Sequence, residues 1–181
     1  GEYSVQDSLP QMDSVLEGLK KHRPEVEFTH RRGCGVLDGS DDEIEAAVVA
    51  AKDSELVLAV MGDKAGLILD CTSGEARDRA TLSLPGRQLE LLKRLHATGV
   101  PVVLVLVNGR PFSLNWEDEH LAAILEAWLP GEEGAKAIAK ALFGEISPAG
   151  RLPITFPRSA GQVPVFYAHR PSGGMSHWKG S

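Results

Sequence analysis

The sequence has no apolar run long enough to cross a lipid bilayer, and its first residues are not a basic segment followed by an apolar core. A membrane-spanning helix needs about 20 mainly apolar residues, and a signal peptide needs a basic start ahead of its apolar core. We therefore expect no membrane partner and see no signal peptide in these 181 residues. These absences assign the protein to no cellular compartment.

Basic residues form no cluster in the sequence, and the formal net charge is −6. Proteins that bind nucleic acids through the phosphate backbone concentrate lysine and arginine on one surface. We therefore expect no nucleic-acid partner.

Cysteine is scarce, with only Cys34 and Cys71 in the chain. Their number and spacing fit neither a zinc site nor a disulfide-rich scaffold. Both follow expected strands and could be neighbours, but two free and partly buried thiols explain them more simply than a disulfide. The histidines are scattered, and His169 and His177 lack the spacing of a metal-binding pair on a helix. We therefore expect no metal site and no cofactor.

What the sequence does contain is an alternation of helical and strand-like segments. Hydrophobic residues make up 43% and charged residues 24%, which is ordinary for one globular domain with tails. The runs 56–61 and 100–107 do not alternate with polar residues, which indicates strands buried on both faces. Ser40 and Glu43 have the spacing of a capping box at the start of a helix. In chain order we expect helix 12–21, strand 25–30, the helix after Ser40, strand 56–61, a helix opened by Pro85, strand 100–107, helix 117–121, strand 122–128, helix 133–143 and strand 152–156.

This order predicts an α/β fold, a three-layer sandwich in which helices cover both faces of a mainly parallel sheet. We expect strand 122–128 at the centre of the sheet, whereas Pro153 predicts a short edge strand over 152–156. Residues 62–84 form a long connection with little regular pattern. A connection of this length in a compact domain is usually functional or disordered.

The long connection contains the segment Thr72–Arg79, which follows a predicted strand. Loops at the carboxyl ends of parallel strands are where α/β proteins bind ligands. Glu75 is therefore a candidate proton donor, and Gly74 beside it would let the backbone approach a ligand closely. A solvated loop glutamate is the competing interpretation.

Polar residues near this loop are further candidates. Asp63 ends a strand at the same edge and could contact a ligand or the loop, but it fits a helix N-cap at least as well. Asp78 is the rival proton donor, although a local ion pair between Asp78 and Arg79 is the simpler interpretation. Asn108 and Arg110 are expected to shape a turn.

Several stretches, taken together and in this order, resemble the C-terminal α/β sandwich domain of glycoside hydrolase family 3, which includes β-glucosidases and β-xylosidases. The resemblance covers nearly the whole chain, and its combined motifs are specific although each alone is weak. The matching stretches are Gly1-Glu2-Tyr3, Arg32-Gly33-Cys34, Val60-Met61-Gly62-Asp63, residues 72–79, Leu82-Ser83-Leu84-Pro85-Gly86, Val107-Asn108-Gly109-Arg110-Pro111, residues 126–134, Leu142-Phe143-Gly144 and residues 147–157.

The resemblance implies a retaining, exo-acting β-glycosidase that removes terminal β-linked glucose or xylose from an oligosaccharide or aryl glycoside. In the family, an N-terminal (β/α)8 barrel carries the nucleophilic aspartate, and the glutamate of a Ser-Gly-Glu pattern, here Glu75, is the general acid/base. Asp63, Gly74, Asp78 and Arg79 are the residues that we expect to contact substrate around it. The sequence contains neither the barrel nor the strand with which the family's domain begins.

On this resemblance we expect a sandwich domain over residues 1–158, incomplete at its N-terminus, and an irregular tail over 159–181. The expected partner is the barrel domain of the same protein, and the chain alone is expected to be inactive. One alternative is a non-catalytic module that contacts carbohydrate or assists domain assembly. Another is an unrelated flavodoxin-like or receiver-like domain, but the phosphate loop or acidic cluster that follows the first strand of those folds is absent.

Overall fold

The computed structural model describes residues 12–66 and 71–168. The predicted capping box is confirmed, because Ser40 Oγ accepts a hydrogen bond from Glu43 N while the Glu43 carboxylate accepts one from Ser40 N. No helix in the described ranges has the length and apolar character needed to cross a membrane. The elements in chain order are α1 (Val15–His22), α2 (Asp41–Lys52), β1 (Val57–Gly62), α3 (Gln88–His96), β2 (Val102–Val107), α4 (Asn115–His120), β3 (Ala123–Glu126), α5 (Gly134–Leu142) and a 3-10 turn, η2 (Ala160–Gln162).

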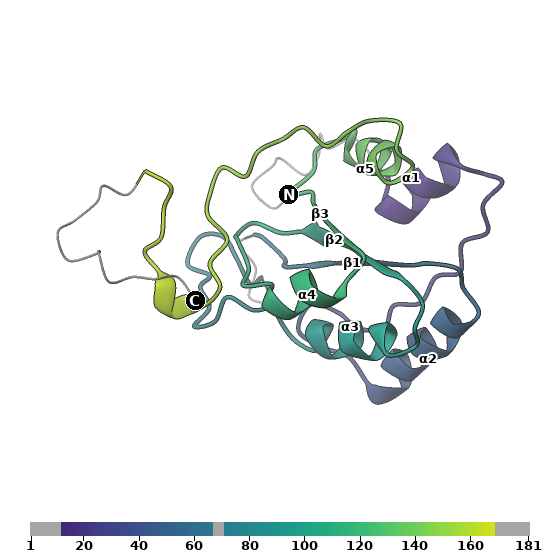
Figure 1. Cartoon of the computed structure of the whole chain (residues 1–181), viewed down its shortest axis with the longest axis horizontal. Helices are drawn as coiled ribbons and strands as arrows, with labels where there is room; N and C mark the ends of the chain where they lie inside the picture. The colour runs from purple at the N-terminus through teal and green to yellow at the C-terminus, as the bar shows by residue number, and fades with distance from the viewer. Residues whose placement is uncertain (1–11, 67–70, 169–181) are drawn as a thin grey trace.

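The strands of the described residues form one parallel sheet in the order β1-β2-β3. Val57 pairs with Val102 at the start of β1, and Val103 pairs with Ala123 at the start of β3. Figure 1 shows this sheet between two layers, with α1 and α5 on one side and α2, α3 and α4 on the other. The predicted α/β sandwich with a parallel sheet and helices on both faces is confirmed.

The main core lies between the sheet and the helices α2 and α3. Leu104 and Leu106 of β2, Ile44 of α2 and Leu92 of α3 are all fully buried in it. Burying one such side chain contributes about 1.5–3 kcal/mol. Because β2 pairs with β1 on one side and β3 on the other, this core anchors the central strand and the loop that follows it.

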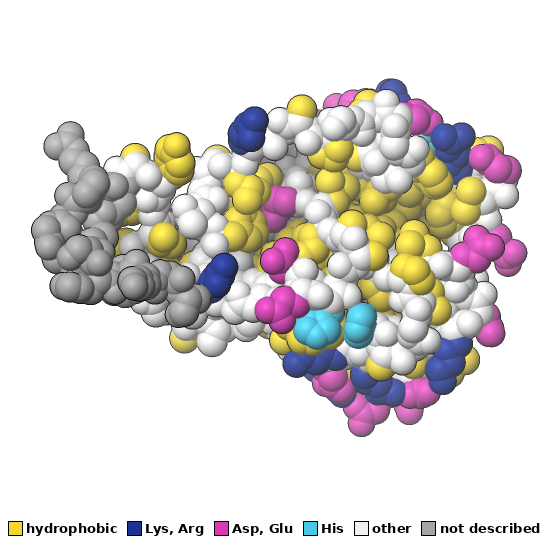
Figure 2. Space-filling view, in the orientation of Figure 1, with side chains coloured by type: hydrophobic (Ala, Val, Ile, Leu, Met, Phe, Trp, Pro, Cys, Tyr) yellow, Lys and Arg dark blue, Asp and Glu magenta, His cyan; other side chains and the backbone are white. Residues whose placement is uncertain are grey.

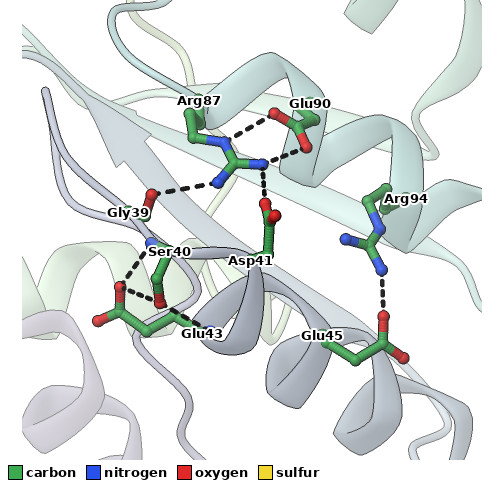
Figure 3. A network of polar contacts seen from close by, with 8 residues as sticks. All are labelled: Gly39, Ser40, Asp41, Glu43, Glu45, Arg87, Glu90 and Arg94. Carbon is green, nitrogen blue, oxygen red and sulfur yellow. Dashed lines mark hydrogen bonds and ion pairs between the residues drawn. The ribbon is translucent and has the colours of Figure 1, made fainter.

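Arginine side chains join α2 to α3 at the surface of this layer (Figure 3). Arg87, just before α3, donates hydrogen bonds to Asp41 at the start of α2 and to Glu90 within α3. Further along the same two helices, Arg94 pairs with Glu45. The pairs are largely exposed, so each contributes little stability.

Several predictions about strands are wrong in detail. Residues 25–30 and 152–156 form no strand, and α3 begins at Gln88 rather than at Pro85, which lies in the preceding turn. A strand becomes regular only where a neighbour accepts and donates its backbone hydrogen bonds, and neither segment has such a neighbour in the described residues. As a result β3 lies at an edge rather than at the centre of the sheet.

The edge of β1 is also open within the described ranges. A groove of about 510 Å³ lies along it, and its lining includes residues 29–33 on one side and strand residues 56–61 on the other. Figure 2 shows hydrophobic side chains gathered in a hollow of the molecule between the α1–α5 pair and the α2–α3 layer. Val60 is 46% exposed, so the prediction that β1 is buried on both faces is wrong.

Candidate active site

Buried polar side chains mark the carboxyl ends of β1 and β2. Asp63, directly after β1, has a side chain that is only 1% exposed, and its Oδ1 accepts a hydrogen bond from Gly109 N at 2.9 Å. Asn108, directly after β2, donates through Nδ2 to the carbonyl oxygen of Arg110 at 2.7 Å, which confirms the predicted turn. Asp63 therefore joins two loops. The alternative N-cap role is wrong, because residues 64–66, which directly follow Asp63, are not helical.

The end of β1 is held by Gln88, a residue that sequence reasoning missed. Gln88 Nε2 donates to the carbonyl oxygen of Gly62, and Gly62 N donates to Gln88 Oε1, both at 2.8 Å. The Gln88 side chain is buried, and the backbone of Gly62 pairs with both its amide oxygen and its amide nitrogen. A polar residue at the start of an otherwise apolar helix face was the only signal for this role.

The connection after β1 folds back on itself to form a narrow neck. Thr72 N donates to Lys64 O at 2.8 Å, and Gly66 N donates to Ser73 O at 3.1 Å. Gly74 has φ +112°, and a Cβ there would lie 2.6 Å from the carbonyl oxygen of Gly66. The structure therefore requires glycine at residue 74 for a backbone–backbone approach, while its contact with substrate stays a prediction.

Glu75 lies in a tight turn just beyond this neck. Arg77 N donates to Gly74 O at 3.2 Å, so Glu75 occupies the second position of a four-residue turn. Glu75 and Ala76 are both exposed, and Ala76 has φ +55°, a left-handed conformation that an L-residue seldom adopts. Strained backbone of this kind is often found at functional sites. The turn presents the Glu75 carboxyl on the surface at the carboxyl end of the sheet.

The charged residues that follow the turn are arranged differently from the expectation. The Asp78 side chain is fully exposed, and its Oδ1 lies 4.0 Å from Nη1 of Arg110. Asp78 therefore faces Arg110, and the predicted local ion pair between Asp78 and Arg79 is wrong. Arg79 Nη2 instead donates to Thr81 Oγ1 at 3.3 Å. Burial, together with the neighbouring Arg110, lowers the pKa of Arg79. Contacts of Asp78 and Arg79 with substrate stay predictions.

Glu126, at the end of β3, is a further carboxylate at this edge of the sheet that sequence reasoning missed. Its Oε1 accepts a hydrogen bond from Trp128 N at 2.8 Å, and its Oε2 accepts a long one from Asn108 Nδ2 at 3.4 Å. Burial raises the pKa of Glu126 despite these hydrogen bonds. The three strand ends therefore carry Asp63, Asn108 and Glu126 side by side, as a polar floor next to the loop.

Within the described ranges, no group of three or more histidine, cysteine, aspartate or glutamate side chains is arranged to hold a metal ion. Cys34 and Cys71 are free thiols, the first half-buried and the second buried. A groove of about 240 Å³ at the end of β1 is lined by Cys34 and Asp63, but Glu75 does not line it. Glu75 is exposed and lies outside this groove.

The strained turn gives a first testable prediction. Replacing Ala76 with glycine is expected to stabilise the domain by about 0.5 kcal/mol, because relief of a left-handed φ exceeds the added entropy of the unfolded chain. Replacing it with valine is expected to destabilise the domain by about 1–2 kcal/mol, since a β-branched side chain tolerates this conformation poorly. Urea unfolding of both variants measures the free energy of unfolding relative to the parent. A change of the same sign in the two variants would contradict the left-handed conformation of Ala76.

Comparison with known proteins shows the family to which the chain is related. Residues 1–179 match the glycosyl hydrolase family 3 C-terminal domain. The chain is 43% identical over 163 residues to a β-xylosidase of Formosa agariphila, which covers 90% of this chain and 22% of that protein. It is 48% identical over 130 residues to a periplasmic β-glucosidase of Salmonella typhimurium, which covers 72% of this chain and 16% of that protein.

A solved structure agrees with this match. The β-glucosidase of Erythrobacter marinus superimposes with a TM-score of 0.84 at 32% identity, over 100% of this chain and 27% of that protein. The chain thus spans between about a sixth and a quarter of the length of these relatives. The family model matches nearly the whole chain, and the solved structure shares its fold. The chain therefore belongs to the family of C-terminal domains found in glycoside hydrolase family 3.

Proposed function

We propose that this chain supplies the general acid/base, Glu75, to a retaining exo-acting β-glycosidase whose nucleophile lies in an N-terminal barrel domain of the same protein. The proposed substrates carry a terminal β-linked glucose or xylose. Relatives of this chain are named as β-glucosidases and β-xylosidases. The domain is proposed to span residues 1–158, with 159–181 as a tail.

The observation that carries the proposal is the placement of Glu75 at an exposed turn. Retaining glycosidases need two carboxyl groups about 5–5.5 Å apart on either side of the glycosidic bond. An exposed carboxyl on a narrow turn can be brought to a sugar held by another domain, whereas the buried Asp63 and the half-buried Glu126 cannot. Glu75 would protonate the leaving oxygen in the first step and deprotonate the attacking water in the second.

The polar floor of Asp63, Asn108 and Glu126 supports the Glu75 turn at the carboxyl end of the sheet. Asp63 and Asn108 are occupied with the backbone of the loops around them. They therefore shape the support on which the exposed Glu75 turn lies. Asp63, Gly74, Asp78 and Arg79 are proposed to lie around the bound sugar.

The proposal predicts that residues 1–181 alone give no measurable glycoside turnover, because one of the two carboxyl groups is lacking. The measurement compares hydrolysis of aryl β-glucosides and aryl β-xylosides by the full-length protein and by this chain at equal concentration. The preferred aryl glycoside also identifies the sugar. Hydrolysis by the purified chain that disappears in its Glu75→Gln variant would contradict the division of the active site. Failure of the full-length protein to cleave either glycoside would leave the chain a non-catalytic module.

A further inference from the structure

The side chain of Arg110 extends from the turn after β2 to the loop that carries Glu75. Its Nη2 donates to the carbonyl oxygen of Thr72 at 2.5 Å and to that of Arg77 at 2.9 Å. These two carbonyl groups lie before and after the exposed turn. One guanidinium nitrogen therefore ties together both ends of the segment that holds Glu75.

Arg110 is itself held firmly. Its backbone carbonyl accepts the hydrogen bond from Asn108, and the neighbouring Gly109 N donates to Asp63 Oδ1. The Arg110 Nε lies 3.7 Å from Asp63 Oδ2, in a pair whose side chains are only 17% and 1% exposed. A pair that is so little exposed is screened by salt much less than a surface pair. The guanidinium thus lies between the Asp63 carboxylate at the end of β1 and the loop carbonyl groups that it binds.

The turn after β2 also lies close to the neck of the loop. A Cβ on Gly109 would be 3.1 Å from Ser73 Oγ and 3.4 Å from Ala65 Cβ. The missing side chain of Gly109 therefore lets the two loops approach closely enough for Arg110 to reach both carbonyl groups.

We propose that Arg110 is a positioning residue for Glu75, which holds the Glu75 turn against the sheet through the Thr72 and Arg77 carbonyl groups. The catalytic consequence rests on the proposed acid/base role of Glu75, but the hold on the turn does not. Lysine would not replace arginine here, because an ammonium group on a flexible stem lacks the planar, pre-organised geometry of the guanidinium.

The experiment uses Arg110→Met and Arg110→Lys variants of the full-length protein. Arg94→Met is the matched control, since Arg94 pairs with Glu45 on the α2–α3 surface, away from the loop. Each variant is assayed with a phenyl glycoside, whose departure needs a proton, and with a dinitrophenyl glycoside, whose departure does not. Hydrogen exchange of residues 71–79 is measured on the same samples.

If Arg110 positions Glu75, kcat/KM for the phenyl glycoside falls by about 10–100-fold in both Arg110 variants, because a misplacement of 1 Å can cost about 100-fold. The loss for the dinitrophenyl glycoside stays within about threefold, since general acid catalysis contributes little there. Exchange over residues 71–79 becomes faster, while the Arg94→Met control matches the parent in both measurements. The lysine variant keeps the charge and serves if the methionine variant does not fold.

Unchanged exchange over residues 71–79 in folded Arg110 variants would overturn the inference. Equal losses of kcat/KM for the two glycosides would overturn it as well, because they would indicate a general structural defect. Faster exchange in these variants, combined with near-normal kinetics of a Glu75→Ala enzyme, would support the hold on the turn and reject the proposed function. The two proposals can therefore fail separately.

Discussion

Alanine in place of Glu75 in the full-length protein is expected to slow hydrolysis of unactivated β-glycosides by about 10²–10⁴-fold, the usual contribution of general acid–base catalysis. Glycosides with activated aryl groups need little help from an acid, so the glycosyl-enzyme should still form from them. Its hydrolysis should be slow, because no base remains to take the proton of the attacking water. A burst of phenol release followed by slow turnover, seen in rapid-mixing kinetics, would be the signature.

External azide should distinguish this loss from a general defect. The azide ion attacks the glycosyl-enzyme without needing a base, so it is expected to restore turnover of the alanine variant. The nucleophilic aspartate proposed for the barrel leaves as a carboxylate, and the product is a β-glycosyl azide, because a retaining enzyme inverts the anomeric centre twice. A Glu75→Gln variant, with its bulkier side chain, should lose activity similarly but respond less to azide.

The matched control is Asp78→Asn, because Asp78 is the other exposed carboxylate close to the turn and was the rival donor in the sequence. This variant is expected to show no response to azide, because any activity that it loses through weaker contact with the sugar does not remove the base. Near-normal kinetics of both Glu75 variants, with a large loss and azide rescue in the Asp78 variant, would transfer the acid/base role to Asp78.

A substitution of Gly62 with alanine is expected to destabilise the domain by about 3 kcal/mol or more, among the largest effects of a single methyl group. Gly62 ends β1 with φ +146°, and a Cβ at this residue would lie 1.9 Å from the carbonyl oxygen of Val107. That oxygen belongs to the backbone of the central strand and cannot move aside. The change would also disturb the pair of hydrogen bonds between Gly62 and Gln88.

Other glycines of the chain offer controls that separate strain from collision. Gly99 has φ +81° but no atom within 4 Å of its Cβ position, and Gly131 likewise has an empty Cβ position. Gly99→Ala should therefore cost only the strain of about 1 kcal/mol, and Gly131→Ala should be nearly neutral. Thermal unfolding of residues 1–181 measures the melting temperatures of the three variants. In a chain of this size, each kcal/mol of lost stability lowers the melting temperature by roughly 2–4 °C. A melting temperature of Gly62→Ala equal to that of Gly99→Ala would contradict the close approach of the two strands.

Much of this fold follows from local signals in the sequence. The capping box at Ser40 predicted where α2 starts, since its hydrogen bonds form between residues three apart. The uninterrupted apolar run around Val102–Val107 predicted a strand covered on both faces, and most side chains of β2 are buried in the structure. The Ser-Gly-Glu segment directed attention to Glu75, and the family resemblance was confirmed by the comparisons.

Tertiary structure decided the rest. Residues 25–30 and 152–156 have strand-like sequences but form no strand in the described residues, because a strand needs a hydrogen-bonding neighbour that its own sequence cannot supply. Asp63 looked like a helix cap or a ligand contact; in the structure its buried carboxylate accepts a hydrogen bond from Gly109 N, and its contact with substrate stays a prediction. Arg110 looked like a turn residue, yet its long side chain reaches carbonyl groups more than thirty positions away in the chain. The sequence by itself determined the helices, the central strand and the candidate carboxyl, whose signals are local, whereas the edges of the sheet and the support of the Glu75 turn depend on which distant segments the fold brings into contact.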